Sequence, residues 1–127
     1  MEIPSDLKYT KEHEWLRMEG EQAVIGITDF AQDSLGDVVY VQLPEPGANI
    51  EQFAKFGEIE SVKAVSDLFS PIGGDVVERN AALDRQPELV NSEPYSGGWL
   101  LRLTPADAAQ IDQLMSAADY EALTASG

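Results

Sequence analysis

The sequence predicts one mainly β domain that ends in a helix. Dense turn signals divide the chain into short segments rich in β-branched residues, the pattern of strands joined by turns. Helical spacing is confined to a short segment after position 28 and to the last part of the chain. A length of 127 residues, 43% of them apolar, suits a single domain with its own core.

Seven extended segments are expected between the turn signals. Each combines β-branched or aromatic residues with a Gly, Pro or polar run at its ends. The first two form a hairpin because the polar run 19–22 separates them. The expected strands are residues 14–18, 23–27, 37–43, 58–65, 68–72, 75–79 and 99–103.

A short helix is expected between the second and third of these strands. Thr28 and Asp29 can cap a helical segment that continues to Leu35. Gly36 ends this helix because glycine readily adopts a positive φ angle.

The C-terminal segment, about residues 105–123, is expected to form one further helix. Thr104 can act as its N-cap, with Pro105 at the first helical position and Asp107 three residues after the cap. Apolar residues then recur with helical spacing, which predicts a packing face. They are Ala108, Ile111, Leu114, Met115 and Ala118.

A short internal repeat favours a fold of two similar β halves. Residues 36–39 are Gly-Asp-Val-Val, and the same four residues recur at 74–77. Lys63 lies between the two copies.

The composition excludes several classes of function. The chain has 23 Asp and Glu against eight Lys and Arg, one His and no Cys, which gives a net charge of −15. Without Cys there are no disulfides, thiolate nucleophiles or iron–sulfur clusters, and one His excludes multi-His metal sites, so no metal site is expected. The negative charge disfavours nucleic acid and membranes as partners, and suits either solubility or steering toward basic docking sites. No apolar run has the length of a membrane helix, and the first residues do not resemble a signal peptide.

Lys63 stands out among the few basic residues. Beyond position 11, the only lysines are Lys55 and Lys63, and small or β-branched residues flank Lys63. Acidic residues lie nearby at Glu58, Glu60 and Asp67. One interpretation is an ordinary solvated lysine in a charged hairpin. The other is a lysine at a β-turn tip that a modifying enzyme acylates, so that it carries a long arm on a rigid base.

A family resemblance favours the second interpretation. Residues 60–67, Glu-Ser-Val-Lys-Ala-Val-Ser-Asp, resemble the lipoylation site of the H protein of the glycine cleavage system. Seven further segments resemble that family and follow in the family's order. They are residues 9–15, 24–32, 35–41, 43–47, 70–74, 89–95 and 98–100.

The resemblance implies a fold and a cofactor. The implied fold is a barrel-sandwich hybrid of two antiparallel sheets, as in lipoyl and biotinyl domains, with short helices and a C-terminal helix. Residues 1–127 would form a single lipoyl-carrier domain, with a core of about 7–103 and the helical segment of about 105–123. Lipoate would be attached to Lys63 as an amide, and both redox sulfurs would belong to the arm of a protein that has no Cys.

The resemblance also implies a shuttle that is not itself an enzyme. A pyridoxal-phosphate-dependent glycine decarboxylase would load an aminomethyl group onto the arm, and an aminomethyltransferase would pass it to tetrahydrofolate. A dihydrolipoyl dehydrogenase would then reoxidise the arm, and a lipoate-attaching enzyme would install it. A monomer is expected. Met at position 1 favours a bacterial cytoplasm over a mature mitochondrial chain.

Four residues are expected to line a cleft that shields the loaded arm. A loaded amine is cationic, so carboxylates suit the cleft. Glu14 and Asp67 match family positions with that role, and Ile27 matches an apolar cleft position. Glu12 occupies a neighbouring position that varies in the family.

Two neighbouring residues carry less functional expectation. His13 is interpreted as a packing or capping residue and not as an acid–base group. Ser34 stands where some family members have a histidine.

Four alternatives fit the residues less well, and a fifth stays open. An acyl carrier protein would have Ser34 at the start of a long helix, whereas Gly36 ends the segment here. A biotinyl carrier has Met on both sides of its lysine, and a lipoyl domain of a 2-oxoacid dehydrogenase has Asp before it, but Val62 precedes Lys63. An enzyme would need a Ser–His–Asp set, a glycine-rich phosphate loop or a metal cluster, and the sequence shows none of these patterns. The alternative that stays open is an H-like protein that relays lipoyl groups to other proteins.

Overall fold

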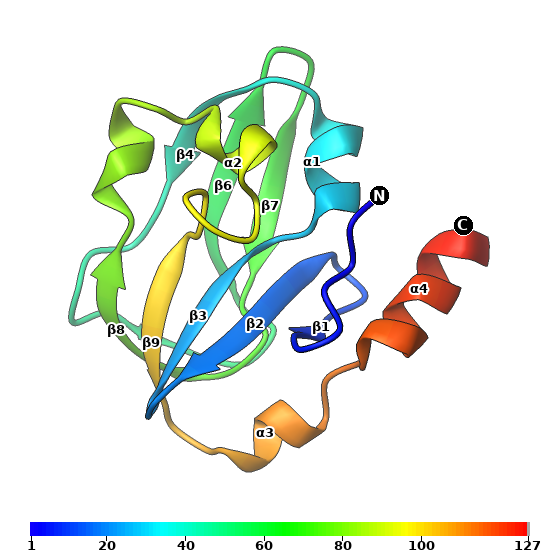
Figure 1. Cartoon of the computed structure of the whole chain (residues 1–127). Helices are drawn as coiled ribbons and strands as arrows, with labels where there is room; N and C mark the ends of the chain where they lie inside the picture. Colours follow the sequence, from blue (N-terminus) through cyan, green and yellow to red (C-terminus); the bar gives the residue numbers. More distant parts are fainter. Residues whose placement is uncertain (127) are drawn as a thin grey trace.

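Two antiparallel sheets form most of the computed structural model, which describes residues 1–126 (Figure 1). The larger sheet has the strand order β1-β2-β3-β9-β8-β5, and the smaller sheet has the order β4-β6-β7. The strands are β1 (Lys8–Tyr9), β2 (Glu14–Glu19), β3 (Gln22–Ile27), β4 (Val38–Gln42), β5 (Asn49–Ile50), β6 (Lys55–Ser61), β7 (Val65–Phe69), β8 (Gly74–Arg79) and β9 (Leu101–Pro105). The helices are α1 (Asp29–Leu35), the 3-10 helix η1 (Ala81–Asp84), α2 (Leu89–Ser92), α3 (Ala109–Asp112) and α4 (Ala117–Ser126).

The main hydrophobic core lies between the two sheets. Ile25 and Leu103 from the larger sheet and Ile59 and Leu68 from the smaller sheet are almost inaccessible to solvent. Apolar side chains from both sheets exclude water from the space between them, which holds the layers together. The predicted fold of two antiparallel sheets with short helices is therefore confirmed, as an open sandwich and not as a closed barrel.

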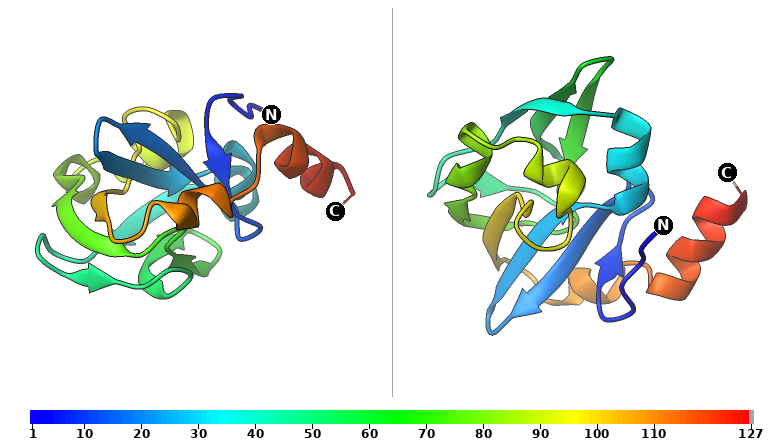
Figure 2. Two further views of the ribbon diagram at one scale, coloured as in Figure 1. Left: turned by 90° about the horizontal axis from the view of Figure 1, so that it is seen from below. Right: turned by 45° about the horizontal axis from the view of Figure 1, so that its top comes forward.

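A second cluster of buried residues covers the other face of β2 and β3. Successive side chains of a strand point to opposite faces, so Val24 enters this cluster while its neighbour Ile25 enters the main core. Trp15 and Tyr9 join Val24, and Tyr120 of α4 stacks on Tyr9 with ring centroids 4.7 Å apart. Figures 1 and 2 show α4 outside the larger sheet, beside β1. The second cluster thus attaches the C-terminal helix to the sandwich.

The expected strands are confirmed in part. The first hairpin, the strand after α1 and the strand near residue 75 lie where the sequence predicts them, within one or two residues. The expected runs 58–65 and 68–72 are wrong in their limits, because β6 ends at Ser61 and β7 already begins at Val65. Residues 62–64 form the turn that joins these two strands. The last strand also begins later than expected, at Leu101.

The single C-terminal helix starting at Pro105 is wrong. Thr104 and Pro105 belong to β9, where they pair with Asp75 and Gly74 of β8. The helical stripe is then interrupted at Met115, whose backbone exchanges two hydrogen bonds of 2.8 and 2.9 Å with Tyr9. This bridge requires extended backbone at Met115, so the segment divides into α3 and α4. A long-range pairing here overrides the local helical pattern.

The expectation for α1 is confirmed at both ends. Thr28 is its N-cap, and its hydroxyl oxygen accepts a hydrogen bond of 3.2 Å from the backbone of Ala31. Gly36 ends the helix with φ of 79°, and its N–H donates to the carbonyl of Gln32. The helix start is thereby fixed close to β3, and its end lies close to the start of β4.

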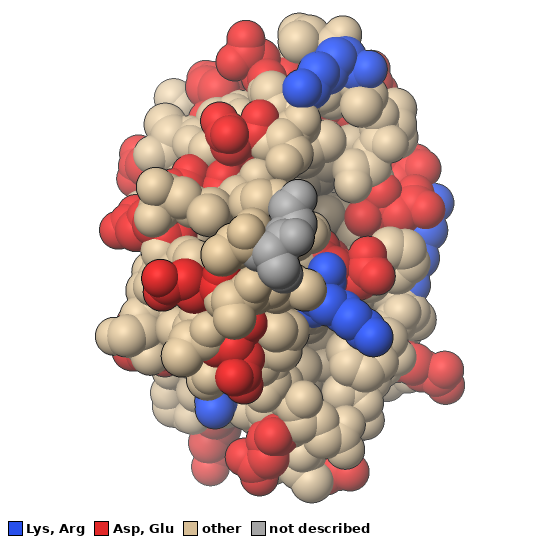
Figure 3. Space-filling model, turned by 90° about the vertical axis from the view of Figure 1, so that its right-hand side faces the viewer, with Lys and Arg blue, Asp and Glu red and all other residues tan. Residues whose placement is uncertain are grey.

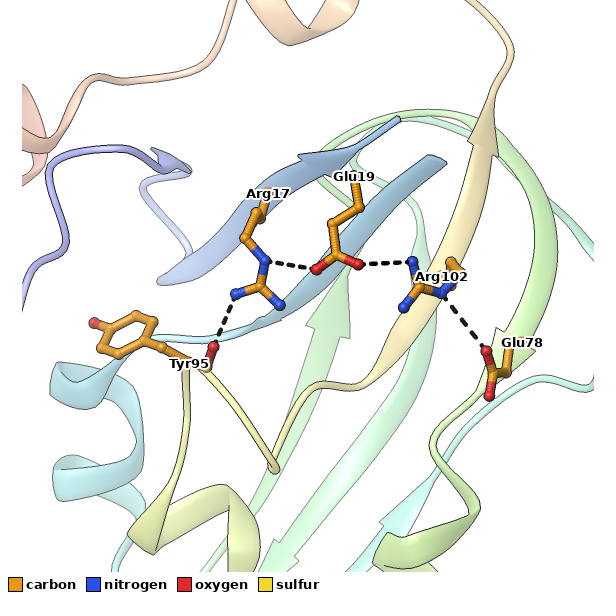
Figure 4. Close-up of polar contacts among 5 residues, drawn as sticks. All are labelled: Arg17, Glu19, Glu78, Tyr95 and Arg102. Carbon is orange, nitrogen blue, oxygen red and sulfur yellow. Dashed lines mark hydrogen bonds and ion pairs between the residues drawn. The ribbon is translucent and has the colours of Figure 1, made fainter. Parts of the chain in front are cut away.

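The outer face of the larger sheet carries a row of ion pairs (Figure 4). The carboxylate of Glu19 lies 2.9 Å from Nε of Arg17 and 3.1 Å from Nη1 of Arg102, and Arg102 also contacts Glu78 at 3.6 Å. Arg17 donates a further hydrogen bond of 2.9 Å to the carbonyl of Tyr95. The row links β2, β9 and β8 across the sheet.

Candidate functional site

Lys63 lies in the turn of the β6–β7 hairpin, at the top of the molecule in Figure 1. The Ser61 hydroxyl oxygen accepts hydrogen bonds from the backbone of Lys63 at 3.3 Å and of Ala64 at 3.1 Å. The backbone of Val62 donates a hydrogen bond of 3.0 Å to the carbonyl of Asp37. These bonds fix the backbone of an otherwise exposed turn, so Lys63 projects from a rigid base.

The side chain of Lys63 passes close to the end of α1. A Cβ atom at Gly36 would lie 3.5 Å from Cε and 3.8 Å from Cδ of Lys63. These distances are ordinary van der Waals contacts, so glycine is required here by its φ of 79° and not by the proximity of Lys63.

A cleft of about 400 Å³ adjoins the hairpin. Strand β7, helix α1 and the turn before β2 supply its walls. Its lining residues are Glu12, His13, Glu14, Ile27, Phe30, Ala31, Ser34, Leu35, Ala64, Val65, Ser66, Asp67 and Leu68. All four residues expected in a cleft line it: Glu12, Glu14, Ile27 and Asp67. The structure therefore brings together residues that are separated by up to 55 positions in the sequence.

Glu14 is the buried acid of this cleft. Only 2% of its surface is exposed, although it carries a carboxyl group. The hydroxyl of Thr10 donates to one carboxyl oxygen at 2.6 Å, and the backbone of Phe69 donates to the other at 3.4 Å. Burial raises the pKa of Glu14 to about 8, against the opposing effect of these two hydrogen bonds. Within residues 1–126, no ion pair offsets a charge on Glu14.

Asp67 and Glu12 are exposed acids of the same cleft. Asp67 on β7 lies 3.2 Å from Nζ of Lys55, which also contacts Glu58 at 3.2 Å. The sequence did not predict this contact of Lys55, because it depends on the register that places Glu58 opposite Asp67. Glu12 has no ion pair in the part of the chain that the structure describes.

His13 packs against its neighbours, as the sequence analysis predicts. Its ring stacks on Phe30 with centroids 4.7 Å apart, and its Nδ1 lies 2.8 Å from the hydroxyl of Tyr120. Burial lowers the pKa of His13, because the charged ring would lose water. Its φ of 70° reflects the tight turn that begins at Thr10.

Tyr120 connects the C-terminal helix to the cleft wall. It is fully buried, and its hydroxyl lies 2.7 Å from that of Thr28, the N-cap of α1. Phe30 and Ser34 of α1 both line the cleft. The sequence analysis missed this role, although Tyr120 is the only aromatic residue after Trp99.

A second cavity of about 590 Å³ lies on the other side of Glu12. Apolar and aromatic side chains dominate its wall, and Glu12 is the one residue that it shares with the cleft. Its lining residues are Tyr9, Thr10, Lys11, Glu12, Phe53, Phe69, Gln113, Leu114 and Met115.

Among the charged side chains on the face shown in Figure 3, the acidic ones are spread over many places and the basic ones occupy a few small areas. One of these areas lies at the top of the view, where Figure 1 places the tip of the β6–β7 hairpin. Across residues 1–126, no three His, Asp or Glu side chains are grouped so as to hold a metal ion. None of the helices described is both long and apolar enough to cross a membrane.

Comparisons with known proteins identify the family. The family model described as "Glycine cleavage H-protein" matches residues 7–127. The glycine cleavage system H proteins of Symbiobacterium thermophilum and Bacillus subtilis are each 54% identical to this chain, over 98% of it and 98% of their own length. That of Magnetococcus marinus is 57% identical over 96% of this chain and 87% of its own length. A crystal structure of an H protein from Mycobacterium marinum has a TM-score of 0.89 and 36% identity, covering 97% of this chain and 99% of that one. The chain therefore belongs to the glycine cleavage H-protein family.

Proposed function

We propose that this protein is a lipoyl carrier of the glycine cleavage system, with lipoate attached to Lys63 as an amide. The observation that carries the proposal is an exposed lysine on a rigid hairpin beside a cleft with three carboxyl groups. Family membership supports the same role, because the matching relatives are named H proteins of that system. The protein would act as a substrate of other enzymes and catalyse nothing alone.

The chemistry of the cleft suits an aliphatic arm with a cationic end. Ala64 and Val65 border both the cleft and the Lys63 turn, so an arm on Lys63 can enter without a change in the hairpin. Ile27 and Leu68 supply an apolar wall, and Glu14 lies among the acids beyond it. When attached, lipoate would supply a disulfide that accepts an aminomethyl group, and the dithiol that remains after this group has been passed on must be reoxidised.

The residues of the cleft would protect the load in two ways. The apolar wall around Ile27 excludes water from the bond that must survive transport. Glu14 and Asp67 would accept hydrogen bonds from the cationic amine, and a charge-assisted bond in a partly buried site is stronger than a neutral one. Glu12 would add negative potential at the rim, since it is exposed and unpaired within residues 1–126.

Four partner enzymes follow from this role. A pyridoxal-phosphate-dependent glycine decarboxylase loads the arm, an aminomethyltransferase that uses tetrahydrofolate unloads it, and a dihydrolipoyl dehydrogenase reoxidises it. A lipoate-attaching enzyme modifies Lys63 beforehand. A net charge of −15 would steer the monomeric carrier toward basic surfaces around the active sites of these partners. The bacterial relatives support a cytoplasmic location.

We also treat residues 1–127 as a single lipoyl-carrier domain. Strands β2 and β3 contribute to both hydrophobic clusters, through Leu16 and Ile25 on one face and Trp15 and Val24 on the other. A shared pair of strands makes the two clusters parts of one folding unit.

The mass of the protein provides the first test. Protein produced in cells supplied with lipoate should gain the mass of one lipoyl group, and Lys63→Arg should abolish the gain while leaving the fold intact. The modified protein should then support glycine–bicarbonate exchange with glycine decarboxylase, and Lys63→Arg should not. A lipoylated Lys63→Arg variant would overturn the assignment of the attachment site.

A further inference from the structure

Lys55 forms an ion pair with Asp67, a carboxylate of the cleft, although Lys55 itself does not line the cleft. It begins β6, and a register irregularity separates it from Gly57. Its Nζ lies 3.2 Å from an oxygen of Glu58 and 3.2 Å from Oδ1 of Asp67, which are directly opposite each other on β6 and β7. One ammonium group therefore bridges a cross-strand pair of acids.

Among the acids of the cleft, only Asp67 has such a partner. Glu12 and Glu14 form no ion pair within residues 1–126, whereas Nζ of Lys55 lies 3.2 Å from Asp67. The two acids raise the pKa of Lys55, with Glu58 as the larger influence, so the ammonium stays charged at neutral pH. Any other cation that approaches Asp67 meets this resident charge.

We propose that Lys55 limits how tightly the cleft holds a cationic load, because it already neutralises Asp67. This inference rests on the proposed function, in which Asp67 accepts a hydrogen bond from the loaded amine. The amine must compete with Lys55 for the carboxylate, or bind its second oxygen against the repulsion of a nearby ammonium. Glu14 then supplies the strong contact and Asp67 an attenuated one.

An attenuated contact suits a carrier. The load must stay in the cleft between enzymes but leave it when the next enzyme draws the arm away. Contacts that hold the load equally at every stage would slow its transfer. Lys55 offers Asp67 an alternative partner once the load departs, so no bare carboxylate is left behind.

The experiment compares rates of spontaneous aminomethyl loss from the lipoylated, loaded protein. Lys55→Gln frees Asp67 and should slow the loss by about two- to fivefold at low salt, the range that exposed ion pairs support. Lys55→Arg keeps the charge and should behave like the parent. Arg85→Gln makes the same change in net charge at an exposed residue at the end of η1, and should leave the rate unchanged.

Asp67→Asn separates this inference from the proposed function. It should speed the loss, and Lys55→Gln should then add nothing to it. If Asp67→Asn leaves the rate unchanged, the proposed role of Asp67 fails. If Asp67→Asn speeds the loss but Lys55→Gln does not slow it, the role of Asp67 stands and that of Lys55 is overturned. The role of Lys55 is also overturned if Arg85→Gln slows the loss as much as Lys55→Gln does.

A second measurement begins with the protein before lipoate is attached. In the unmodified protein, NMR titration of the Lys55 side chain should show that Asp67→Asn lowers the pKa of its ammonium, because one of the two acids that raise it is gone. Loading the arm should shift the Lys55 side-chain signals, and that shift should be absent in Asp67→Asn. The proposal would be contradicted if neither Asp67→Asn nor loading of the arm changes the Lys55 side-chain signals.

Discussion

Strand β2 begins with Glu14 and ends with Glu19, and these two acids have opposite surroundings. Glu19 has a side chain 41% exposed and lies between two arginines, which lower its pKa. Glu14 is 2% exposed and has no cationic partner within residues 1–126, and its pKa is raised to about 8. Two glutamates on the same strand therefore differ in exposure, in charged partners and in the direction of their pKa shift.

The difference shows where the chain accepts an energetic cost. On the outer face of the larger sheet, Arg17 and Arg102 form ion pairs with the carboxylate of Glu19. This arrangement stabilises the folded chain at little energetic cost. In the cleft, a carboxyl group is buried without a counter-charge, and burying it ionised is costly. Proteins retain such unfavourable groups mainly at functional sites.

The largest expected effect is on the pH dependence of folding stability. An acid whose pKa is raised on folding stabilises the native state below its unfolded pKa, near 4.5, and this contribution is lost as pH rises through about 8. The unfolding free energy of the parent should therefore fall between pH 5 and 8, relative to Glu14→Gln, by about 2–4 kcal/mol. Urea unfolding of both proteins across this range measures it.

The comparison with Glu14→Gln is needed because His13 acts in the opposite direction. Its pKa is lowered on folding, so its contribution to stability is lost as pH falls through 6.5 and below. Both proteins contain His13, so the difference between them isolates Glu14. If the unfolding free energies of the parent and Glu14→Gln change in parallel with pH, folding does not raise the pKa of Glu14.

The next effect concerns protection of the load. Glu14→Ala should speed spontaneous aminomethyl loss by about 10- to 100-fold, because a buried charge-assisted hydrogen bond contributes about 1.5–3 kcal/mol. Lipoylation of Lys63 should be unaffected, since the hairpin bonds of Ser61 do not involve Glu14. Glu19→Ala is the matched control on the same strand, and equal rates of loss in the two variants would contradict the cleft role.

A smaller effect is expected at the link between α4 and the cleft. Tyr120→Phe removes a hydroxyl that Thr28 and His13 both use, and should lower the unfolding free energy by about 1–2 kcal/mol. It should also speed aminomethyl loss, because Thr28 caps the helix that forms one cleft wall. Both effects are measurable in the lipoylated protein, by thermal unfolding and by release of the load.

Tyr9→Phe provides the control for this link. It removes the other hydroxyl of the same ring stack, and in the described part of the chain that hydroxyl bonds only to the carbonyl of Pro4. Tyr9→Phe should lower stability without changing the rate of aminomethyl loss. If both variants release the load equally fast, α4 supports the fold in general and not the cleft wall.

The sequence predicts those features that local chemistry determines. Thr28 and Gly36 delimit α1 because capping and positive φ are local properties, and the structure confirms both. The family resemblance brings Glu14 and Asp67 to one cleft, which no local pattern could do. The single C-terminal helix is wrong because Met115 pairs with Tyr9, more than 100 residues earlier.

The electrostatic surroundings of each acid are the hardest feature to predict. Nothing in the sequence of β2 distinguishes a buried Glu14 from a paired Glu19, because burial depends on how α1 and β7 cover one end of the strand. The contact of Lys55 with Asp67 likewise requires the register of β6 and β7. Charge counts alone therefore say how acidic the protein is but not which acids are free to act.

The smallest effect is expected at Glu19 itself. Glu19→Gln weakens two exposed ion pairs, with Arg17 and Arg102, and such pairs contribute less than about 1 kcal/mol each because water screens them. Arg17 keeps its hydrogen bond to Tyr95 and its position over the Trp15 ring, 5.1 Å from the centroid, so the outer face should stay ordered. Unfolding in urea at low and high salt should show a loss below about 1 kcal/mol that disappears as salt rises. The rate of aminomethyl loss should not change. A large loss of stability that salt does not reduce would mean that the paired end of β2 is as critical as its buried end, and the contrast between the two glutamates would then lie in their function alone.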